Sequence, residues 1–102
     1  MPDFFFKLHP PRASFPGDIT AEEQAVIAEH VAYWEAELGR SVLTFGPVMA
    51  PDGVFGMGVV SLPDEAAAQS FAAQDPVISS GRGFRYDVFP MQAARPPRAG
   101  NI

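Results

Sequence analysis

The order of local patterns along this chain predicts an α+β fold of the ferredoxin-like type, with the element order βαββαβ. Four segments have strand character, two have helical character, and the 102 residues fit a single domain. An order of this kind needs two right-handed crossovers. It therefore predicts a four-stranded antiparallel sheet with both helices on one face. Hydrophobic residues make up 47% of the chain, which is enough to form a core without a metal or a disulfide.

The first strand and a long loop are predicted within residues 4–19. Phe4 to Leu8 is short and aromatic and is closed by His9-Pro10-Pro11, which favours a buried strand over a helix. His9 to Ile19 then holds three prolines, a glycine and Asp18, so we expect a loop without regular structure. Loops of this length are usually functional or mobile.

The first helix is predicted to begin after Thr20. Thr20 and Glu23 have the spacing of a capping box, in which each side chain accepts a hydrogen bond from the backbone N–H of the other residue. Gly39 provides a C-terminal stop. Apolar residues recur at helical spacing between these ends and are expected to form the core stripe: Ile27, Val31, Trp34 and Leu38.

The second half of the chain is expected to supply a hairpin, a helix and a last strand. Residues 42–48 and 54–62 have strand character, and Pro51-Asp52-Gly53 between them is typical of a turn. An alanine-rich helix is predicted from Pro63 to about residue 73, with acidic residues at its N-terminus. Residues 84–91 alternate like a half-buried strand. Residues 1–91 are therefore assigned to one domain and 92–102 to a C-terminal tail.

Composition and charge restrict the partners of this protein. The formal charge of −5 and the absence of a basic run argue against nucleic acid. The apolar run at the N-terminus is too short to be a signal or membrane segment, and the chain has no cysteine, which together fit a cytoplasmic protein. Nine phenylalanines exceed what one helix-covered sheet face needs. We therefore expect the open face to pack against a second copy, forming a homodimer.

His30 and Asp75 are the best candidates for chemistry. His30 lies beside the apolar stripe, at the boundary of core and solvent, where it is either a packed, hydrogen-bonded histidine or a general base or acid. Asp75 precedes Pro76, where a carboxylate often only begins a turn. With antiparallel helices on one sheet face, the end of the second helix returns toward the first. Asp75 could then orient the His30 imidazole.

Three further residues are candidate substrate contacts. Arg12, in the proline-rich loop, could hold an anionic or phenolate substrate, or could simply face solvent. Tyr33, together with Trp34, could wall a pocket beside His30, and His9 is either a site residue or loop surface. Glu23 is explained by the capping box and is left structural. Neither a phosphate-binding glycine motif nor a convincing set of metal ligands is present, so no cofactor or metal is expected.

Several segments together resemble the YCII-related family, a group of small proteins with a dimeric α+β barrel architecture. The resemblance covers residues 3–91 and rests on five features: HVAYW around His30, LTFGPV, PDGVFGMGVV, the Glu65-Ala66 helix start, and Asp75-Pro76 with the later Gly81. It implies a catalytic dyad at His30 and Asp75. At least one branch of that family is linked to dehydrochlorination of a chlorinated, hydroxylated aromatic. Val77 departs from the aromatic residue that many members have after the Asp-Pro pair.

The leading hypothesis is a cofactor-independent enzyme of the lyase or isomerase type. In it, His30 moves a proton on a small cyclic or phenolic molecule, while Asp75 holds the ring. The alternative is a non-catalytic domain that binds a small ligand, or has a regulatory role, through the same cleft. A third possibility is a purely dimeric interaction module, which would need no pocket at all.

Overall fold

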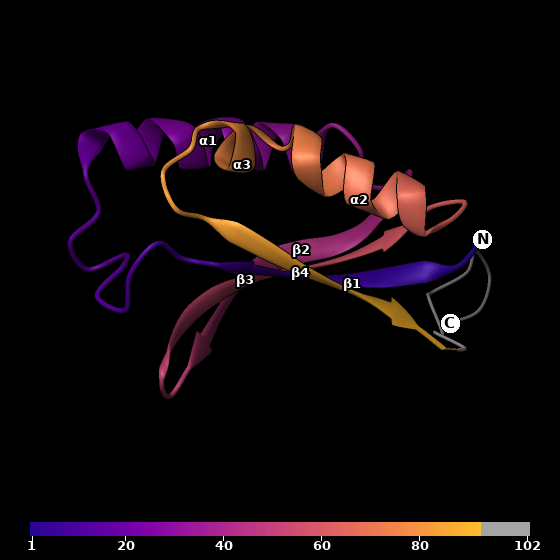
Figure 1. Ribbon diagram of the computed structural model, residues 1–102, viewed down its shortest axis with the longest axis horizontal. Coiled ribbons are helices and arrows are strands. Elements are labelled where there is room, and N and C mark those ends of the chain that lie inside the picture. The colour runs from indigo at the N-terminus through magenta and orange to yellow at the C-terminus, as the bar shows by residue number, and fades with distance from the viewer. Residues whose placement is uncertain (93–102) are drawn as a thin grey trace.

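One antiparallel sheet, with the strand order β2-β3-β1-β4, carries all the helices on one face (Figure 1). The computed structural model describes residues 1–92. Its elements follow the order β1 (Asp3–His9), α1 (Ala21–Glu35), β2 (Val42–Ala50), β3 (Gly53–Ser61), α2 (Glu65–Gln74), α3 (Pro76–Ser79) and β4 (Arg85–Met91). The predicted ferredoxin-like α+β fold is confirmed. The predicted tail lies, apart from residue 92, outside the described residues.

Alternation along β1 divides its side chains between the two sheet faces. Phe4, Phe6 and Leu8 are buried under the helices, whereas Phe5 and Lys7 point to the open face and are half-buried. The same alternation holds in β4, where Phe84, Tyr86 and Val88 were expected to face inward. Phe84 is buried just before the strand, while Tyr86 and Val88 pack against the core.

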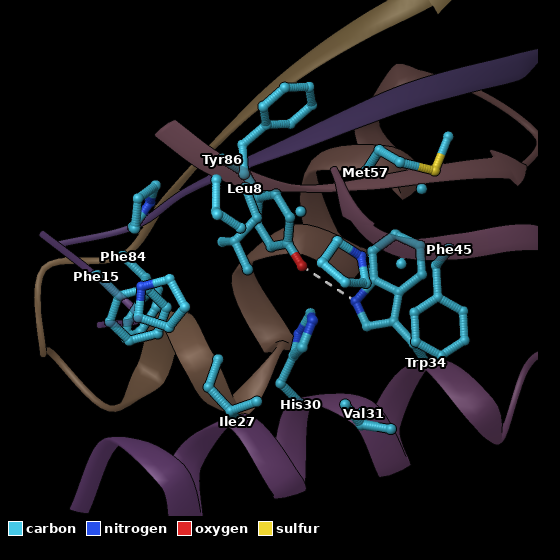
Figure 2. Close-up of a pocket in the computed structure, with 18 of the residues that line it drawn as sticks. Leu8, Phe15, Ile27, His30, Val31, Trp34, Phe45, Met57, Phe84 and Tyr86 are labelled. Atoms are coloured by element: carbon cyan, nitrogen blue, oxygen red, sulfur yellow. Dashed lines mark hydrogen bonds between the residues drawn. The ribbon is translucent and has the colours of Figure 1, made fainter. Parts of the chain in front are cut away.

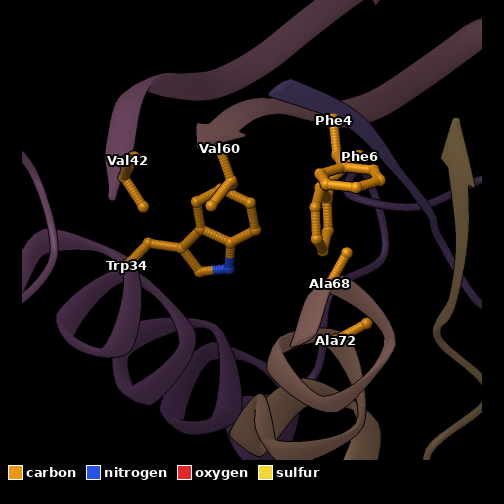
Figure 3. Close-up of a cluster of buried hydrophobic side chains, with 7 residues drawn as sticks. All are labelled: Phe4, Phe6, Trp34, Val42, Val60, Ala68 and Ala72. Atoms are coloured by element: carbon orange, nitrogen blue, oxygen red, sulfur yellow. The ribbon is translucent and has the colours of Figure 1, made fainter. Parts of the chain in front are cut away.

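The core is densest beneath α2 (Figure 3). Ala68 and Ala72 are the buried residues of this helix, and their small side chains allow it to approach the sheet closely. Phe6 lies at the centre and contacts the rings of Trp34, Phe71 and Tyr86 edge to face, at centroid distances of 5.4, 5.7 and 5.6 Å. Edge-to-face pairs of this kind add about 0.5–1.5 kcal/mol each beyond the area they bury.

Helix α1 begins as predicted but differs from the prediction at its end and on its inner face. The capping box of Thr20 and Glu23 is present, with both hydrogen bonds formed. The helix ends at Glu35, so Leu38 lies beyond it and is 49% exposed. The predicted core stripe of Ile27, Val31, Trp34 and Leu38 is therefore wrong in part: only Trp34 is buried. Ile27 and Val31 line a cavity instead.

A short helix also appears where only a turn was expected. Asp75 caps the N-terminus of α3, its side chain accepting a hydrogen bond from the Val77 amide, and Pro76 occupies the first turn, where its missing N–H costs nothing. Asp75 also follows α2 as its C-terminal cap. It is thereby fixed at the junction of two helices, facing α1. None of the helices in residues 1–92 is long and apolar enough to cross a membrane.

Candidate active site

His30 of α1 and Asp75 at the α2–α3 junction are in direct contact. The Nδ1 atom of His30 lies 2.8 Å from Oδ2 of Asp75, across a sequence separation of 45 residues. The His30 side chain is 13% exposed and that of Asp75 only 1%. The predicted contact is therefore present, and its carboxylate is shielded from water.

Asp75 is held by more partners than His30 alone. The Trp34 indole N–H and the Tyr86 hydroxyl both donate to Oδ2, at 2.8 and 2.6 Å, while the Val77 amide donates to Oδ1 at 3.0 Å. Burial raises the pKa of the Asp75 carboxyl, but the hydrogen bonds from His30, Tyr86 and Val77 outweigh it. The pKa therefore lies below its usual value. Asp75 is therefore ionised, and both of its carboxylate oxygens accept hydrogen bonds.

This arrangement assigns the protons around Asp75. An ionised carboxylate only accepts, so Nδ1 of His30 donates to Asp75. When the ring carries no second proton, Nε2 is a free lone pair. Burial, together with the Asp75 charge, raises the pKa of Tyr86 far above its usual value, which keeps its hydroxyl protonated and donating. Within residues 1–92, Nε2 of His30 has no hydrogen-bond partner, and His30 is part of a cavity wall.

The cavity lies between α1, the helix-facing side of the sheet and the loop of residues 10–19, and has a volume of about 360 Å³. Figure 2 shows His30 rising from α1 toward Tyr86 and Trp34, with Ile27 and Val31 beside it on the same helix. The lining is apolar, with several aromatic rings, and includes Leu8, Phe15, Phe45, Met57 and Phe84.

Two glycines of β3 allow large side chains to lie close to the strand in the cavity wall. Gly56 pairs with Leu8 and Gly58 with Phe6 across the β1–β3 ladder, so both lie on the face beneath α1 but supply no side chain. A Cβ atom at Gly58 would stand 2.3 Å from Cζ3 of Trp34, which is sterically impossible without movement. The glycine therefore lets the Trp34 indole lie against β3, where its N–H reaches Asp75.

Tyr33, a predicted substrate contact, is turned away from the cavity. Its hydroxyl donates to the Phe71 carbonyl at 2.9 Å, and its ring stacks on Phe71 with centroids 4.9 Å apart. Burial and the Asp75 charge raise the pKa of Tyr33 to about 12. In this structure Tyr33 joins α1 to α2.

Arg12 also lies outside the cavity wall, with its guanidinium occupied. It donates to both carboxylate oxygens of Glu23, at 2.7 and 2.8 Å, and to the side chain and carbonyl of Asp18. These contacts lower the pKa of Glu23 to about 2, mainly through the Arg12 hydrogen bonds. Glu23 thus has a second role besides capping, because it fastens the loop whose Phe15 and Ile19 line the cavity.

His9 is placed on the opposite side of the sheet from His30. Its Nε2 atom lies 2.7 Å from Oδ2 of Asp87. Asp87 pairs with Lys7 across the β1–β4 ladder and is therefore diagonal to His9. His9 lines a separate, shallow recess with Lys7 and Arg85. Of the predicted site residues, the structure brings together His30 and Asp75 and separates both from Arg12, Tyr33 and His9. Among residues 1–92, no three histidine or acidic side chains gather as a metal site would require.

Tyr86 is a site residue that sequence reasoning missed. Trp34 was predicted to belong to the core and to a pocket wall, but its hydrogen bond to Asp75 was not predicted. The signal was available in part. A buried indole N–H and a buried phenol each require a partner, and Asp75 is the buried carboxylate at the same end of the helix layer.

Comparison with protein-family models finds the YCII-related domain over residues 8–92. The chain belongs to the YCII-related family. Among solved structures, it is similar to the 5-chloro-2-hydroxyhydroquinone dehydrochlorinase of Burkholderia phenoliruptrix in complex with 2,5-dihydroxybenzoquinone. That similarity has a TM-score of 0.63 at 20% identity and covers 89% of this chain and 95% of the other. At this identity it shows a shared fold. No curated protein matches the sequence.

Proposed function

We propose that this protein is a cofactor-independent enzyme of the lyase or isomerase type, in which His30 is the general base. The observation that carries the proposal is the Nε2 atom of His30. It faces an apolar cavity while the other ring nitrogen is fixed by the buried, ionised Asp75. A carboxylate in this position orients the imidazole and stabilises the imidazolium that forms when Nε2 takes a proton.

Trp34 and Tyr86 support this chemistry without performing it. Both donate to the same Asp75 oxygen that accepts from His30, so the carboxylate cannot rotate away from the ring. The Tyr86 proton is already committed to Asp75. Tyr86 therefore acts as a positioning residue and does not supply a proton to the substrate.

The substrate we propose is a small cyclic or phenolic molecule, and the reaction to test first is loss of HCl from a chlorinated hydroquinone. The family resemblance and the printed activity of the similar structure support this choice. In such a reaction two hydroxyl protons leave oxygen, one proton is added to the carbon that carries chlorine, and chloride leaves with the electron pair of the C–Cl bond. Nε2 of His30 can take up and return these protons, the net products are a quinone, one proton and chloride, and no external oxidant or reductant is needed.

The test measures chloride release from 5-chloro-2-hydroxyhydroquinone by the wild type and three variants. His30→Gln should lower kcat by a factor of about 10² or more, and Asp75→Asn should also lower it. Asp87→Asn is the matched control, because it alters the other histidine–aspartate contact and should leave turnover unchanged. Equal rates in the wild type and His30→Gln would refute the general-base role.

A ligand-binding module without catalysis is the second candidate. It is favoured by one observation, that His30 is the only residue with a free polar side-chain atom among the described residues of the cavity wall. Binding that survives both His30→Gln and Asp75→Asn, with no turnover in the wild type, would establish this alternative.

We also propose a homodimer joined through the open sheet face. Phe5 and Phe89 lie side by side there, with ring centroids 6.4 Å apart, and Phe89 is 50% exposed. Val59 pairs with Phe5 in the next strand and extends the apolar surface. Light scattering should give twice the chain mass for the wild type and a lower mass for Phe89→Asp. A monomeric wild type at micromolar concentration would contradict the proposal.

A further inference from the structure

The charge on the cavity wall is as informative as its shape. None of the described residues that line the cavity carries a carboxylate, an ammonium or a guanidinium group. Of the nearby basic groups, Arg12 is bound by Asp18 and Glu23, and Lys7 lies on the open side of the sheet, where its ammonium is 4.7 Å from the Phe55 ring centroid. An anion placed in the cavity would find no permanent positive charge to compensate its lost hydration.

Asp75 adds a second reason against an anionic ligand. Its buried negative charge stands directly behind His30, on the far side of the ring from the cavity. The chain as a whole also carries a formal charge of −5. The Asp75 charge and the negative net charge of the chain both disfavour an anion beside Nε2.

Among the side chains of the cavity wall, one polar atom is left to hydrogen-bond a ligand. Three lining residues have polar side-chain atoms, His30, Trp34 and Tyr86, and the last two spend theirs on Asp75. With Nδ1 of His30 also committed, Nε2 remains as a single acceptor. A ligand bound against this wall therefore meets one free side-chain acceptor and is otherwise surrounded by apolar side chains.

The walls and the volume restrict the ligand further. Trp34 and Phe45 form one aromatic wall, with centroids 5.6 Å apart, and Phe15 and Phe84 another, at 5.4 Å. A volume of about 360 Å³ is near the lower end of the range for small-molecule sites. Flat molecules of one or two rings match both features.

We infer that the cavity selects uncharged one- or two-ring aromatic molecules that present a single hydroxyl or N–H donor to Nε2 of His30, and that it rejects their carboxylate analogues. The inference rests on the proposed function in taking this cavity as the substrate site. To the proposed function it adds which charge and which hydrogen-bond donors the ligand carries. A binding experiment tests both properties without any turnover.

The test uses three probes of the same shape: 2-naphthol, which is neutral with a donor; 2-methoxynaphthalene, which is neutral without one; and 2-naphthoate, which is anionic. Trp34 is the only tryptophan of the chain and lines the cavity, so its indole N–H gives a single NMR cross-peak that reports occupancy at pH 8. We expect saturable shifts with 2-naphthol. Binding should be roughly tenfold weaker for 2-methoxynaphthalene and at least about a hundredfold weaker for 2-naphthoate.

A positive charge placed at the rim should reduce this preference. Val31 lines the cavity one residue after His30 and is 37% exposed, so a lysine there can stay hydrated while reaching a bound carboxylate. Val31→Lys should raise the affinity for 2-naphthoate at least about tenfold. Ala32→Lys, with the same charge on an exposed residue that does not line the cavity, should leave it unchanged.

Each outcome separates this inference from the proposed function. Equal binding of 2-naphthol and 2-naphthoate by the wild type, or no binding of any probe, would overturn the inference. The expected order of affinities without chloride release from 5-chloro-2-hydroxyhydroquinone would leave the ligand class standing and refute the chlorinated substrate. Turnover of that substrate together with preferred binding of 2-naphthoate would support the chlorinated substrate and refute the ligand class.

Discussion

The two faces of the sheet each carry a histidine–aspartate contact, and the two contacts differ in almost everything except length. His30 and Asp75 lie 2.8 Å apart on the helix-covered side, and His9 and Asp87 lie 2.7 Å apart on the open side. Asp75 is 1% exposed and accepts three further hydrogen bonds, whereas Asp87 is 42% exposed and its other contact is Arg85 at 3.4 Å.

The difference shows that the contact alone does not make a catalytic candidate. An exposed carboxylate beside a histidine is screened by water and salt and is worth little. A buried carboxylate with several donors keeps its charge and its orientation, so it can fix the histidine tautomer. Only the helix-side histidine lines the apolar cavity, whereas His9 lines the recess on the open side of the sheet.

The largest expected effect concerns the support of the buried pair. Trp34→Ala removes a buried indole that packs on Phe6 and donates to Asp75, so the free energy of unfolding should fall by about 3–5 kcal/mol. Leu38→Ala is the matched control from the same predicted stripe, and it should change stability by less than about 1 kcal/mol because Leu38 is exposed. Urea unfolding measures both. Similar losses for the two variants would contradict the packing described here.

A smaller effect is expected from the glycine that seats this indole. In Gly58→Ala the new Cβ would meet the Trp34 ring at 2.3 Å, so we expect a loss of about 1–3 kcal/mol. Gly46→Ala is the control on the neighbouring strand, because nothing lies within 4 Å of a Cβ there. Its stability in urea should match the wild type. An unchanged Gly58→Ala protein would mean that the indole can lie elsewhere.

Local patterns determined much of what could be predicted from the sequence. The capping box, the Pro51-Asp52 turn and the first strand follow from neighbouring residues, and the structure contains all three. The approach of Asp75 to His30 needed two further assumptions, the antiparallel helix layer and the family resemblance.

What the sequence did not reveal depends on contacts distant in the chain. The sequence allowed Arg12 to bind a substrate, but the structure shows its guanidinium bound by Glu23 and Asp18. Leu8 and Trp34 lie close to β3 because Gly56 and Gly58 leave one face of that strand without side chains, a spacing of two that the sequence displays. Its meaning appears only once α1 is known to cover those positions.

Substitution of each aspartate tests directly whether the two histidine–aspartate pairs differ. Asp75→Asn replaces an acceptor-only group by an amide, so His30 should lose its exclusive Nδ1–H tautomer and stability should fall by about 1–3 kcal/mol. Asp87→Asn should leave the His30 tautomer unchanged and shift stability by less than about 0.5 kcal/mol. Ring ¹⁵N chemical shifts report the tautomer. An identical His30 spectrum in wild type and Asp75→Asn would remove Asp75 from the site.

The smallest expected effect is the acid dependence of the two pairs. The His9 hydrogen bond holds the pKa of Asp87 below its usual value of 3.8. The pKa of Asp75 also lies below 3.8, because its hydrogen bonds outweigh the effect of burial. A carboxyl with a lowered folded pKa binds fewer protons than in the unfolded chain. It therefore contributes stability that is complete above the unfolded pKa and is lost as pH falls through the folded one.

Urea unfolding between about pH 2.5 and pH 5 should therefore show stability rising with pH, and each Asp→Asn variant should flatten part of that rise. Salt separates the two contributions. At about 1 M salt the Debye length is near 3 Å, so the exposed Asp87 contribution should nearly vanish while that of the buried Asp75 persists. If salt reduced both contributions equally, Asp75 would be as accessible to ions as Asp87, and the shielding that distinguishes the helix-side pair would be absent in solution.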